Sequence, residues 1–135
     1  MSSEVRLLQA EQSVVVVSEG AVSIADFHAA RAHVAEVLGE RQWRRVLFDC
    51  REVERPVTLI EAYGLTASLS GAFPSGTRIA VVISDETEID LQFLEESARR
   101  TYGLSFKTFH VYADALKWLS SPKGAKEGIP RVFVF

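Results

Sequence analysis

The sequence holds few of the residues from which cross-links and metal sites are built. Cys50 is the single cysteine among 135 residues, so neither an internal disulfide nor a multi-thiolate zinc site can form. The three histidines do not pair on one helix face, because His28 and His33 are five positions apart and His110 lies far along the chain. A net charge of -3 gives no basic surface for nucleic acid. We therefore expect no metal, no cofactor and no nucleic-acid partner.

Long apolar segments are also lacking. Residues 1–10 contain neither a basic start nor an uninterrupted apolar run, so they do not predict a secretory signal. Residues 57–73 carry one charge, Glu61, but they include two glycines and stop near Pro74, short of the roughly 20 apolar residues that a membrane span requires. A chain of this length is long enough for one domain with its own core. We expect one soluble, cytoplasmic domain without a membrane span.

The first half of the chain predicts a β-hairpin, a helix and a further strand. Residues 4–8 and 13–17 are expected strands, the second with four valines, and they are separated by a short polar stretch. The four consecutive valines of the second segment are typical of a strand that is buried on both faces. Ser23 can cap a helix whose apolar residues recur at helical spacing and which should end before Gly39. Residues 45–49 then form a strand.

The second half alternates helices and strands. Thr58 and Glu61 have the spacing of a capping box, in which a hydroxyl and a carboxylate satisfy the first backbone N–H groups of a helix, and this helix is expected to run to about Phe73. The other predicted elements are a strand over 78–83, a helix capped by Ser84 and Asp85 and ending at Gly103, a strand over 106–111 and a helix over 113–119. The order ββαβαβαβα predicts a single-domain α/β fold with a mixed, mostly parallel sheet and an N-terminal hairpin.

Three short motifs carry a family resemblance. They are Leu47-Phe48-Asp49-Cys50-Arg51 at the end of a strand, Arg78-Ile79-Ala80-Val81-Val82 on the next strand and Ala115-Leu116-Lys117-Trp118-Leu119 in the last helix. Together with the element order, they make residues 5–120 similar to the SpoIIAA-like branch of the STAS domain family. The resemblance implies a STAS-like domain over residues 1–121, followed by a linker and apolar tail over residues 122–135.

The resemblance also implies a regulatory or binding module rather than an enzyme. Some STAS domains are switched by phosphorylation of a Ser or Thr at the start of the second helix, and Thr58 is the nearest matching hydroxyl here. The Asp and Gly of the phosphorylated members are missing from residues 56–60, so helix capping competes with phosphorylation as the role of Thr58. The branch is also compared with CRAL-TRIO lipid carriers, which implies a small amphipathic ligand as an alternative.

Charged and hydroxyl side chains gather where two parallel strands are expected to end. In open α/β sheets, ligands bind outside the carboxyl ends of the strands. Asp49 and Arg51 point the same way on an extended strand, so either they pair with each other or Arg51 binds an anion. No glycine-rich phosphate cradle accompanies them, which favours the pair. The candidate binding residues at these strand ends are Asp49, Arg51, Glu54, Arg55, Ser84 and Asp85.

Cys50 lies between Asp49 and Arg51 and is the candidate nucleophile. The sequence indicates no histidine beside it, and Asp49 tends to raise the thiol pKa whereas Arg51 tends to lower it. Alternation along the strand places the thiol on the opposite face from both neighbours. We expect an unreactive, partly buried thiol and no enzymatic activity.

The helix expected after Thr58 is apolar on all sides, with Leu59, Tyr63 and Phe73 among its apolar residues. Such a helix must be buried on more than one side, which allows a central helix, a subunit interface or one wall of a lipid pocket. We predict a regulatory module that binds a protein partner, or itself as a homodimer, through this helix and the strand ends. The alternative is a carrier or sensor of an amphipathic ligand held between this helix and the sheet.

The last residues combine a polar linker with an apolar end. Residues 123–128 are rich in Lys and Gly, whereas the residues from Val132 to Phe135 alternate valine and phenylalanine. An alternating apolar segment can pair as an edge strand, although terminal residues also stay unpaired in many domains. Because two exposed phenylalanines favour aggregation, we expect this segment to pair with its own sheet or with that of a partner.

Overall fold

A five-stranded mixed sheet forms the centre of the molecule, in the spatial order β1-β2-β3-β4-β5. The computed structural model describes residues 2–21, 23–54, 59–84 and 90–121. The elements are β1 (Ser2–Leu8), β2 (Ser13–Gly20), α1 (Ile24–Arg41), β3 (Arg45–Val53), α2 (Leu59–Ala67), β4 (Arg78–Val82), α3 (Leu91–Tyr102), β5 (Ser105–Phe109) and α4 (Tyr112–Ser120). The predicted α/β fold and its order ββαβαβαβα are confirmed.

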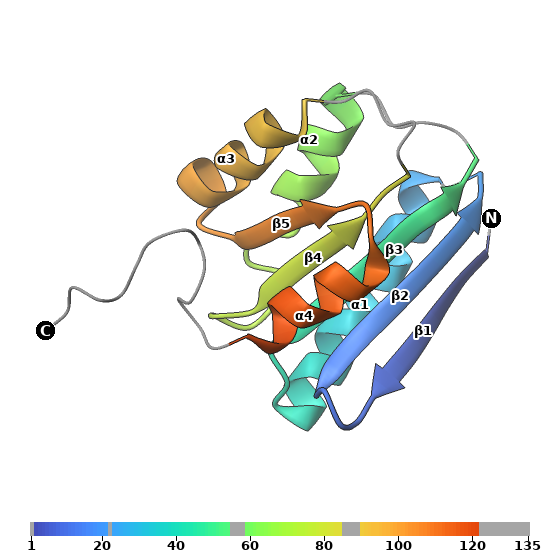
Figure 1. Ribbon diagram of the computed structural model, residues 1–135, viewed down its shortest axis with the longest axis vertical. Coiled ribbons are helices and arrows are strands. Elements are labelled where there is room, and N and C mark those ends of the chain that lie inside the picture. The colour runs from blue at the N-terminus through green and yellow to red at the C-terminus, as the bar shows by residue number, and fades with distance from the viewer. Residues whose placement is uncertain (1, 22, 55–58, 85–89, 122–135) are drawn as a thin grey trace, which may run out of the picture.

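The two faces of the sheet are covered unequally. β1 runs antiparallel to β2, and β2, β3, β4 and β5 run parallel to one another. Figure 1 shows α1, α2 and α3 on one face and α4 on the other. α1 lies over β1 and β2, α3 packs against α2 and β5, and α4 crosses β3, β4 and β5. On the α4 side, α4 contacts β1 and β2 less extensively than β3, β4 and β5, although Val15 of β2 is buried in the core under α4.

β2 is buried from both sides, as the valine run predicts. Val14 and Val16 belong to the core under α1, α2 and α3, whereas Val15 belongs to the core under α4, and none of the three is more than 1% exposed. Full burial of a valine side chain contributes on the order of 1.5–3 kcal/mol. The strand therefore requires cover on both of its faces.

α1 continues past the glycine at which the sequence predicts its end. Gly39 lies inside the helix, and Gln42 forms the C-cap in the left-handed conformation with φ 61°, donating its backbone N–H to the carbonyl of Leu38. The extra turn carries Trp43 to a position where it is only 7% exposed. Burial of this indole explains why the helix does not stop at an exposed glycine.

α2 is shorter than predicted, because it ends at Ala67 rather than near Phe73. The hydroxyl of Ser68 donates to the carbonyl of Leu65 at 2.6 Å, and a series of tight turns follows. Serine competes in this way with helical hydrogen bonds. Gly71 then adopts φ 77°, a left-handed conformation that glycine tolerates without strain.

The cap of α3 is Asp90, so the prediction that Ser84 and Asp85 cap this helix is wrong for Ser84, and Asp85 lies outside the described residues. The carboxylate of Asp90 accepts the backbone N–H of Phe93 at 3.0 Å. The strand and the helix are therefore joined by a longer connection than the sequence suggests. Gly103 ends α3 in the left-handed conformation with φ 64°, as predicted.

Arg78 anchors the C-terminal end of α4. This residue is only 5% exposed, its Nη1 donates to the carbonyl of Ser121 at 2.7 Å, and its Cζ lies 4.4 Å from the centroid of the Trp118 ring. A guanidinium that donates to a carbonyl and stacks on an indole is stabilised by both contacts. The point at which the chain leaves α4 is thereby fixed at the start of β4.

Leu119, which is fully buried on α4, tests how much this single helix contributes to stability. Leu119→Ala should lower the free energy of unfolding by about 2–5 kcal/mol, because the truncation leaves a cavity against the sheet. Lys117→Ala, an exposed position on the same helix, should change it by less than about 0.5 kcal/mol. Urea denaturation followed by circular dichroism measures both. Equal losses for the two variants would contradict the packing of α4.

Candidate functional site

Asp49 and Arg51 form the predicted ion pair on β3. Arg51 Nε donates to Asp49 Oδ1 at 2.9 Å, and Arg51 Nη2 donates to Asp49 Oδ2 at 2.8 Å. Two parallel hydrogen bonds between a guanidinium and a carboxylate fix both groups in position. The side chain of Asp49 is 9% exposed and that of Arg51 is 42% exposed. The pair therefore links a buried carboxylate to a guanidinium that reaches solvent.

The sequence predicts that β3 ends at Asp49, but the strand continues to Val53. It does so because β2 stays paired with it beyond a bulge, up to the pairing of Gly20 with Val53. β4 pairs with β3 only as far as Asp49, opposite Val82. Arg51 therefore lies in the part of β3 that extends past β4, at the bulge where Cys50 and Arg51 together stand opposite one residue of β2.

Two residues that the sequence analysis did not single out, Tyr112 and Arg6, interact with this pair, and Glu4 pairs with Arg6. Arg51 Cζ lies 5.3 Å from the centroid of the Tyr112 ring at the start of α4, a cation–π contact. On β1, Arg6 Nε lies 3.1 Å from Glu4 Oε2, and the charge of Arg6 acts on Asp49. The two-residue spacing of Glu4 and Arg6 on a strand was a usable signal, but nothing in the sequence indicates that Tyr112 meets Arg51.

The pKa of Asp49 is lowered although the residue is buried. Burial alone raises the pKa of a carboxyl group, but the hydrogen bonds and charge of Arg51, together with the charge of Arg6, outweigh burial. The hydrogen bond to Asp49 in turn raises the pKa of Arg51. The two groups are therefore both charged at neutral pH.

Cys50 faces the opposite side of the sheet, as strand alternation predicts. It is half-buried and packs against the core under α1, α2 and α3. Burial, and secondarily the charge of Asp49, raise the pKa of this thiol to about 12. Because the thiolate is the reactive form of cysteine, the side chain is unsuited to nucleophilic catalysis at neutral pH.

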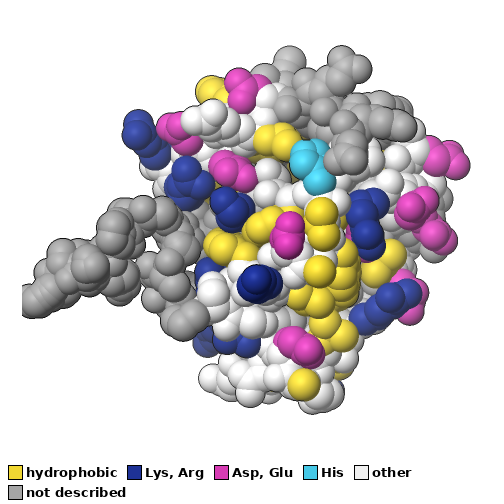
Figure 2. Space-filling model, in the orientation of Figure 1, with side chains coloured by type: hydrophobic (Ala, Val, Ile, Leu, Met, Phe, Trp, Pro, Cys, Tyr) yellow, Lys and Arg dark blue, Asp and Glu magenta, His cyan; other side chains and the backbone are white. Residues whose placement is uncertain are grey.

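A strip of hydrophobic side chains runs along the α4 side of the molecule, bordered by charged ones (Figure 2). Of the hydrophobic residues that are partly buried against the core on this side, four belong to β1, β2 and α4: Leu8, Val17, Tyr112 and Leu116. We call these four residues the apolar strip. Val111, which precedes Tyr112, is 52% exposed. The strip lies where α4 meets the less covered strands β1 and β2, and Arg51 of the Asp49–Arg51 pair contacts it at Tyr112.

The other residues predicted at the strand ends are partly described. Glu54 is exposed immediately after β3, and Ser84 is half-buried two residues after β4. Both lie at the carboxyl ends of parallel strands, as predicted. The predicted residues Arg55, Thr58 and Asp85 lie outside the described residues, and Leu59 is described only as the first residue of α2.

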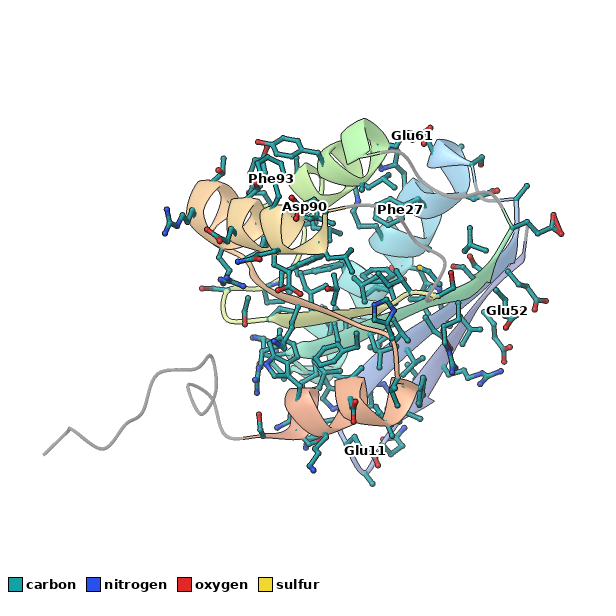
Figure 3. The ribbon with its side chains drawn as sticks, turned by 45° about the horizontal axis from the view of Figure 1, so that its top comes forward. Glu11, Phe27, Glu52, Glu61, Asp90 and Phe93 are labelled. Carbon is teal, nitrogen blue, oxygen red and sulfur yellow. The ribbon has the colours of Figure 1, made fainter. Side chains whose placement is uncertain are left out.

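Tyr63 and Phe73 lie on the other side of the sheet from Asp49 and Arg51. Tyr63 of α2 stacks on Phe93 of α3 (labelled in Figure 3) with 6.4 Å between ring centroids, and it meets Tyr102 edge-on at 5.8 Å. A hydrogen bond with Tyr63 raises the pKa of Tyr102. Phe73 packs against the main core. The sequence analysis therefore predicted one binding surface for side chains that the fold places on two separate faces of the sheet.

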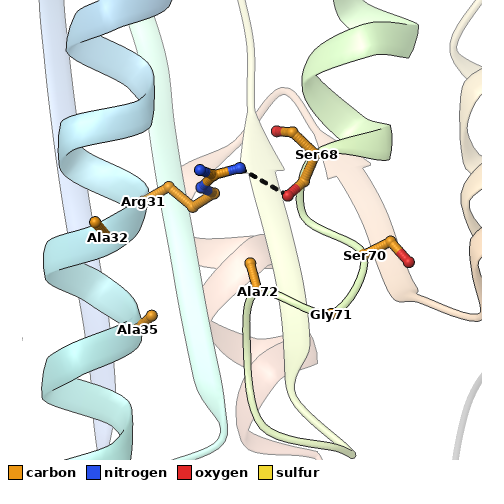
Figure 4. Close-up of a pocket in the computed structure, with 7 residues that line it drawn as sticks. All are labelled: Arg31, Ala32, Ala35, Ser68, Ser70, Gly71 and Ala72. Carbon is orange, nitrogen blue, oxygen red and sulfur yellow. Dashed lines mark hydrogen bonds between the residues drawn. The ribbon is translucent and has the colours of Figure 1, made fainter.

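A shallow depression of about 340 Å³ lies between α1 and the turns that follow α2 (Figure 4). Arg31 Nη1 donates to the carbonyl of Ser68 at 2.9 Å across it. Its lining residues are Arg31, Ala32, Ala35, Ser68, Ser70, Gly71 and Ala72. This lining does not include Tyr63 or Phe73, beneath which the ligand-carrier alternative expects its pocket.

Metal binding finds no support in the described part of the chain, where no three His, Cys, Asp or Glu side chains gather closely enough to hold an ion. None of the described helices has the length and apolar character needed to cross a bilayer.

Two solved structures share this fold. An anti-sigma factor antagonist from Mycobacterium paratuberculosis is 16% identical, with a TM-score of 0.64 over 89% of this chain and 94% of that chain. An uncharacterised protein of the DUF3478 family with a SpoIIAA-like fold, from Shewanella loihica PV-4, is 20% identical, with a TM-score of 0.54 over 87% of this chain and 92% of that chain. No family model and no curated protein matches the sequence. The predicted SpoIIAA-like fold is confirmed.

Asp49→Asn tests the ion pair through the dependence of stability on pH. Because the folded-state pKa lies below that of an unfolded aspartate, about 3.9, the charged pair stabilises the fold above that pH, and this stabilisation is lost as the pH falls through the folded-state pKa. We expect the variant to lose about 1–3 kcal/mol at neutral pH and the difference from the parent to shrink below about pH 4. Urea denaturation across this range measures it, and a difference independent of pH would contradict the assignment.

The raised pKa of Cys50 predicts slow alkylation of the folded protein. At about pH 8, iodoacetamide should modify the folded chain at least about tenfold more slowly than the same chain in guanidinium chloride, because burial suppresses both the thiolate and access to it. Mass spectrometry of timed samples measures both rates. Alkylation that is equally fast in the two conditions would revive the nucleophile hypothesis.

Proposed function

We propose that this protein is a regulatory module that acts by binding a protein partner and has no catalytic step of its own. One observation carries the proposal: Arg51 is held by Asp49, stacked on Tyr112 and still 42% exposed in its side chain. Arginine and tyrosine are among the residues that contribute most of the binding energy in protein interfaces. The apolar strip beside them supplies the apolar centre of such a surface.

The site is pre-organised for binding. Fixing a long side chain on association costs roughly 0.5–1.5 kcal/mol, and Arg51 is already fixed by its two hydrogen bonds to Asp49. Its remaining donors stay available to a partner. An acidic or carbonyl-rich segment that lies across the apolar strip is the partner chemistry that suits this arrangement.

The proposed contact surface is centred on Arg51 and Tyr112 and extends to Glu54 and Ser84 at the carboxyl ends of the strands. Arg55, Asp85, Thr58 and the start of α2 with Leu59 remain proposed members of the same edge. Tyr63 and Phe73 are excluded from this surface, because they lie across the sheet from Arg51.

A second copy of the chain is one candidate partner, and a homodimer remains part of the proposal. The likeness to an anti-sigma factor antagonist supports a protein partner, since a protein so named acts on another protein. Phosphorylation of Thr58 remains a prediction, which peptide mass mapping of protein from its source would test. The ligand-carrier alternative also remains a prediction, without support from the packing around Tyr63 and Phe73.

Matched charge reversals test the proposed surface. Arg51→Glu should weaken binding of a purified partner, or self-association, at least about tenfold, because it removes a central contact and adds a like charge beside Asp49. Arg100→Glu makes the same change at an exposed position on α3, across the sheet, and should change affinity less than about twofold. Isothermal titration or analytical ultracentrifugation gives both values.

Two further variants separate binding from folding. Tyr112→Ala removes the ring beneath Arg51 without changing the charge, and Glu54→Arg reverses a charge at the strand end. Each variant is used only where its unfolding curve shows a folded chain. Unchanged affinity in Arg51→Glu, Tyr112→Ala and Glu54→Arg would contradict the placement of the contact surface.

A further inference from the structure

The sheet has two edge strands, β1 and β5, and on β5 a described side chain binds one of the outer backbone groups. Phe109 accepts the backbone N–H of Ile83 at 2.9 Å, so Phe109 faces β4 and the N–H of its neighbour Thr108 points outward. Glu95 Oε2 accepts this N–H at 2.7 Å and the Thr108 hydroxyl at 2.6 Å. The carboxylate therefore occupies one of the donors that an added strand would need on β5.

β1 forms the other edge and has seven residues, Ser2–Leu8. Between Glu4 and Leu8, no described side chain hydrogen-bonds to its backbone. The Glu4–Arg6 ion pair joins two side chains on one face of the strand, so it leaves the outer backbone edge accessible. Uncovered edges of this length readily accept another strand.

We propose that residues Ile129–Phe135 pair with β1 of the same chain as a sixth, antiparallel strand. This segment has seven residues, as β1 has, and it alternates valine and phenylalanine from Val132 onward. Strand addition satisfies backbone groups along its whole length and places alternate side chains on opposite faces of the sheet. The proposal does not depend on the function proposed above.

The path from α4 to β1 is short enough for the linker. Ser121 is hydrogen-bonded to Arg78 at the start of β4. The neighbouring strands lie side by side at the same end of the sheet: Arg78 pairs with Arg45 on β3, Val46 pairs with Val14 on β2, and Ser13 pairs with Leu8 on β1. Four strand spacings of about 4.8 Å make roughly 19 Å. The seven residues 122–128 span up to about 23 Å when extended.

The same geometry sets the direction of the added strand and determines which of its alternate residues face β1. A segment that arrives beside Leu8 meets the end of β1, so it runs antiparallel to β1. Pro130 has no N–H and fits where the backbone points away from the sheet. Residues 130, 132 and 134 then face outward, and the N–H groups of Arg131, Phe133 and Phe135 face β1.

Proline substitutions at neighbouring positions of the full chain test which N–H groups face β1. Phe133→Pro removes an N–H that should face β1, whereas the control Val132→Pro removes one that should face solvent. By NMR amide exchange, every second amide from Glu4 to Leu8 should exchange at least about tenfold faster in Phe133→Pro than in the parent chain. The same amides should stay within about twofold in Val132→Pro.

Nuclear Overhauser contacts identify the partner strand directly. Cross-strand α-proton contacts between Ile129–Phe135 and β1, unchanged on dilution, would support the proposal. Identical amide exchange in the parent and Phe133→Pro would overturn it. Contacts with β5 instead, or protection that disappears on dilution together with a dimer, would also overturn it, since the segment would then pair with a different edge or a second copy.

Discussion

Burial of the two central strands from both sides is the constraint on which the rest of the structure depends. Val15 on β2 and Leu47 on β3 are fully buried on the α4 side, and Val14 and Val46 are fully buried on the other. Strands of this kind need helices on both faces. Three helices cover one face, whereas α4 alone covers the second and packs mainly on β3, β4 and β5, so partly buried side chains complete the cover towards β1. The apolar strip and the Asp49–Arg51 pair lie in this region.

Asp49 shows how the same constraint shapes the electrostatics. A carboxylate whose side chain is only 9% exposed is costly unless it is paired, because burial disfavours its charged form. Arg51 supplies the pairing, and Tyr112 of α4 supplies a surface for the guanidinium. A requirement for stability thus places a rigid, partly exposed arginine at a strand end. The same arrangement is what makes the position suitable for recognition.

The element order could be predicted from the sequence, because helical and strand periodicities depend on local side-chain patterns. Helix ends were harder: burial of Trp43 extended α1 past Gly39, and Ser68 with Gly71 shortened α2. The Asp49–Arg51 pair was predictable because two-residue spacing on a strand fixes it. The sequence could not predict that Arg51 contacts Tyr112 or that Tyr63 lies far from Arg51, since both depend on which face of the sheet each helix covers.

The central claim is that this protein acts by binding a protein partner and does not carry a small ligand. The claim therefore concerns which molecules are bound to the chain in its cell. Native mass spectrometry of the protein purified from its source organism, followed by a denaturing spectrum of the same sample, tests this most directly. We expect a complex whose mass is the chain plus a second protein or a second copy, with no small-molecule adduct. A monomer carrying a small adduct that is lost on denaturation would contradict the claim and establish a carrier.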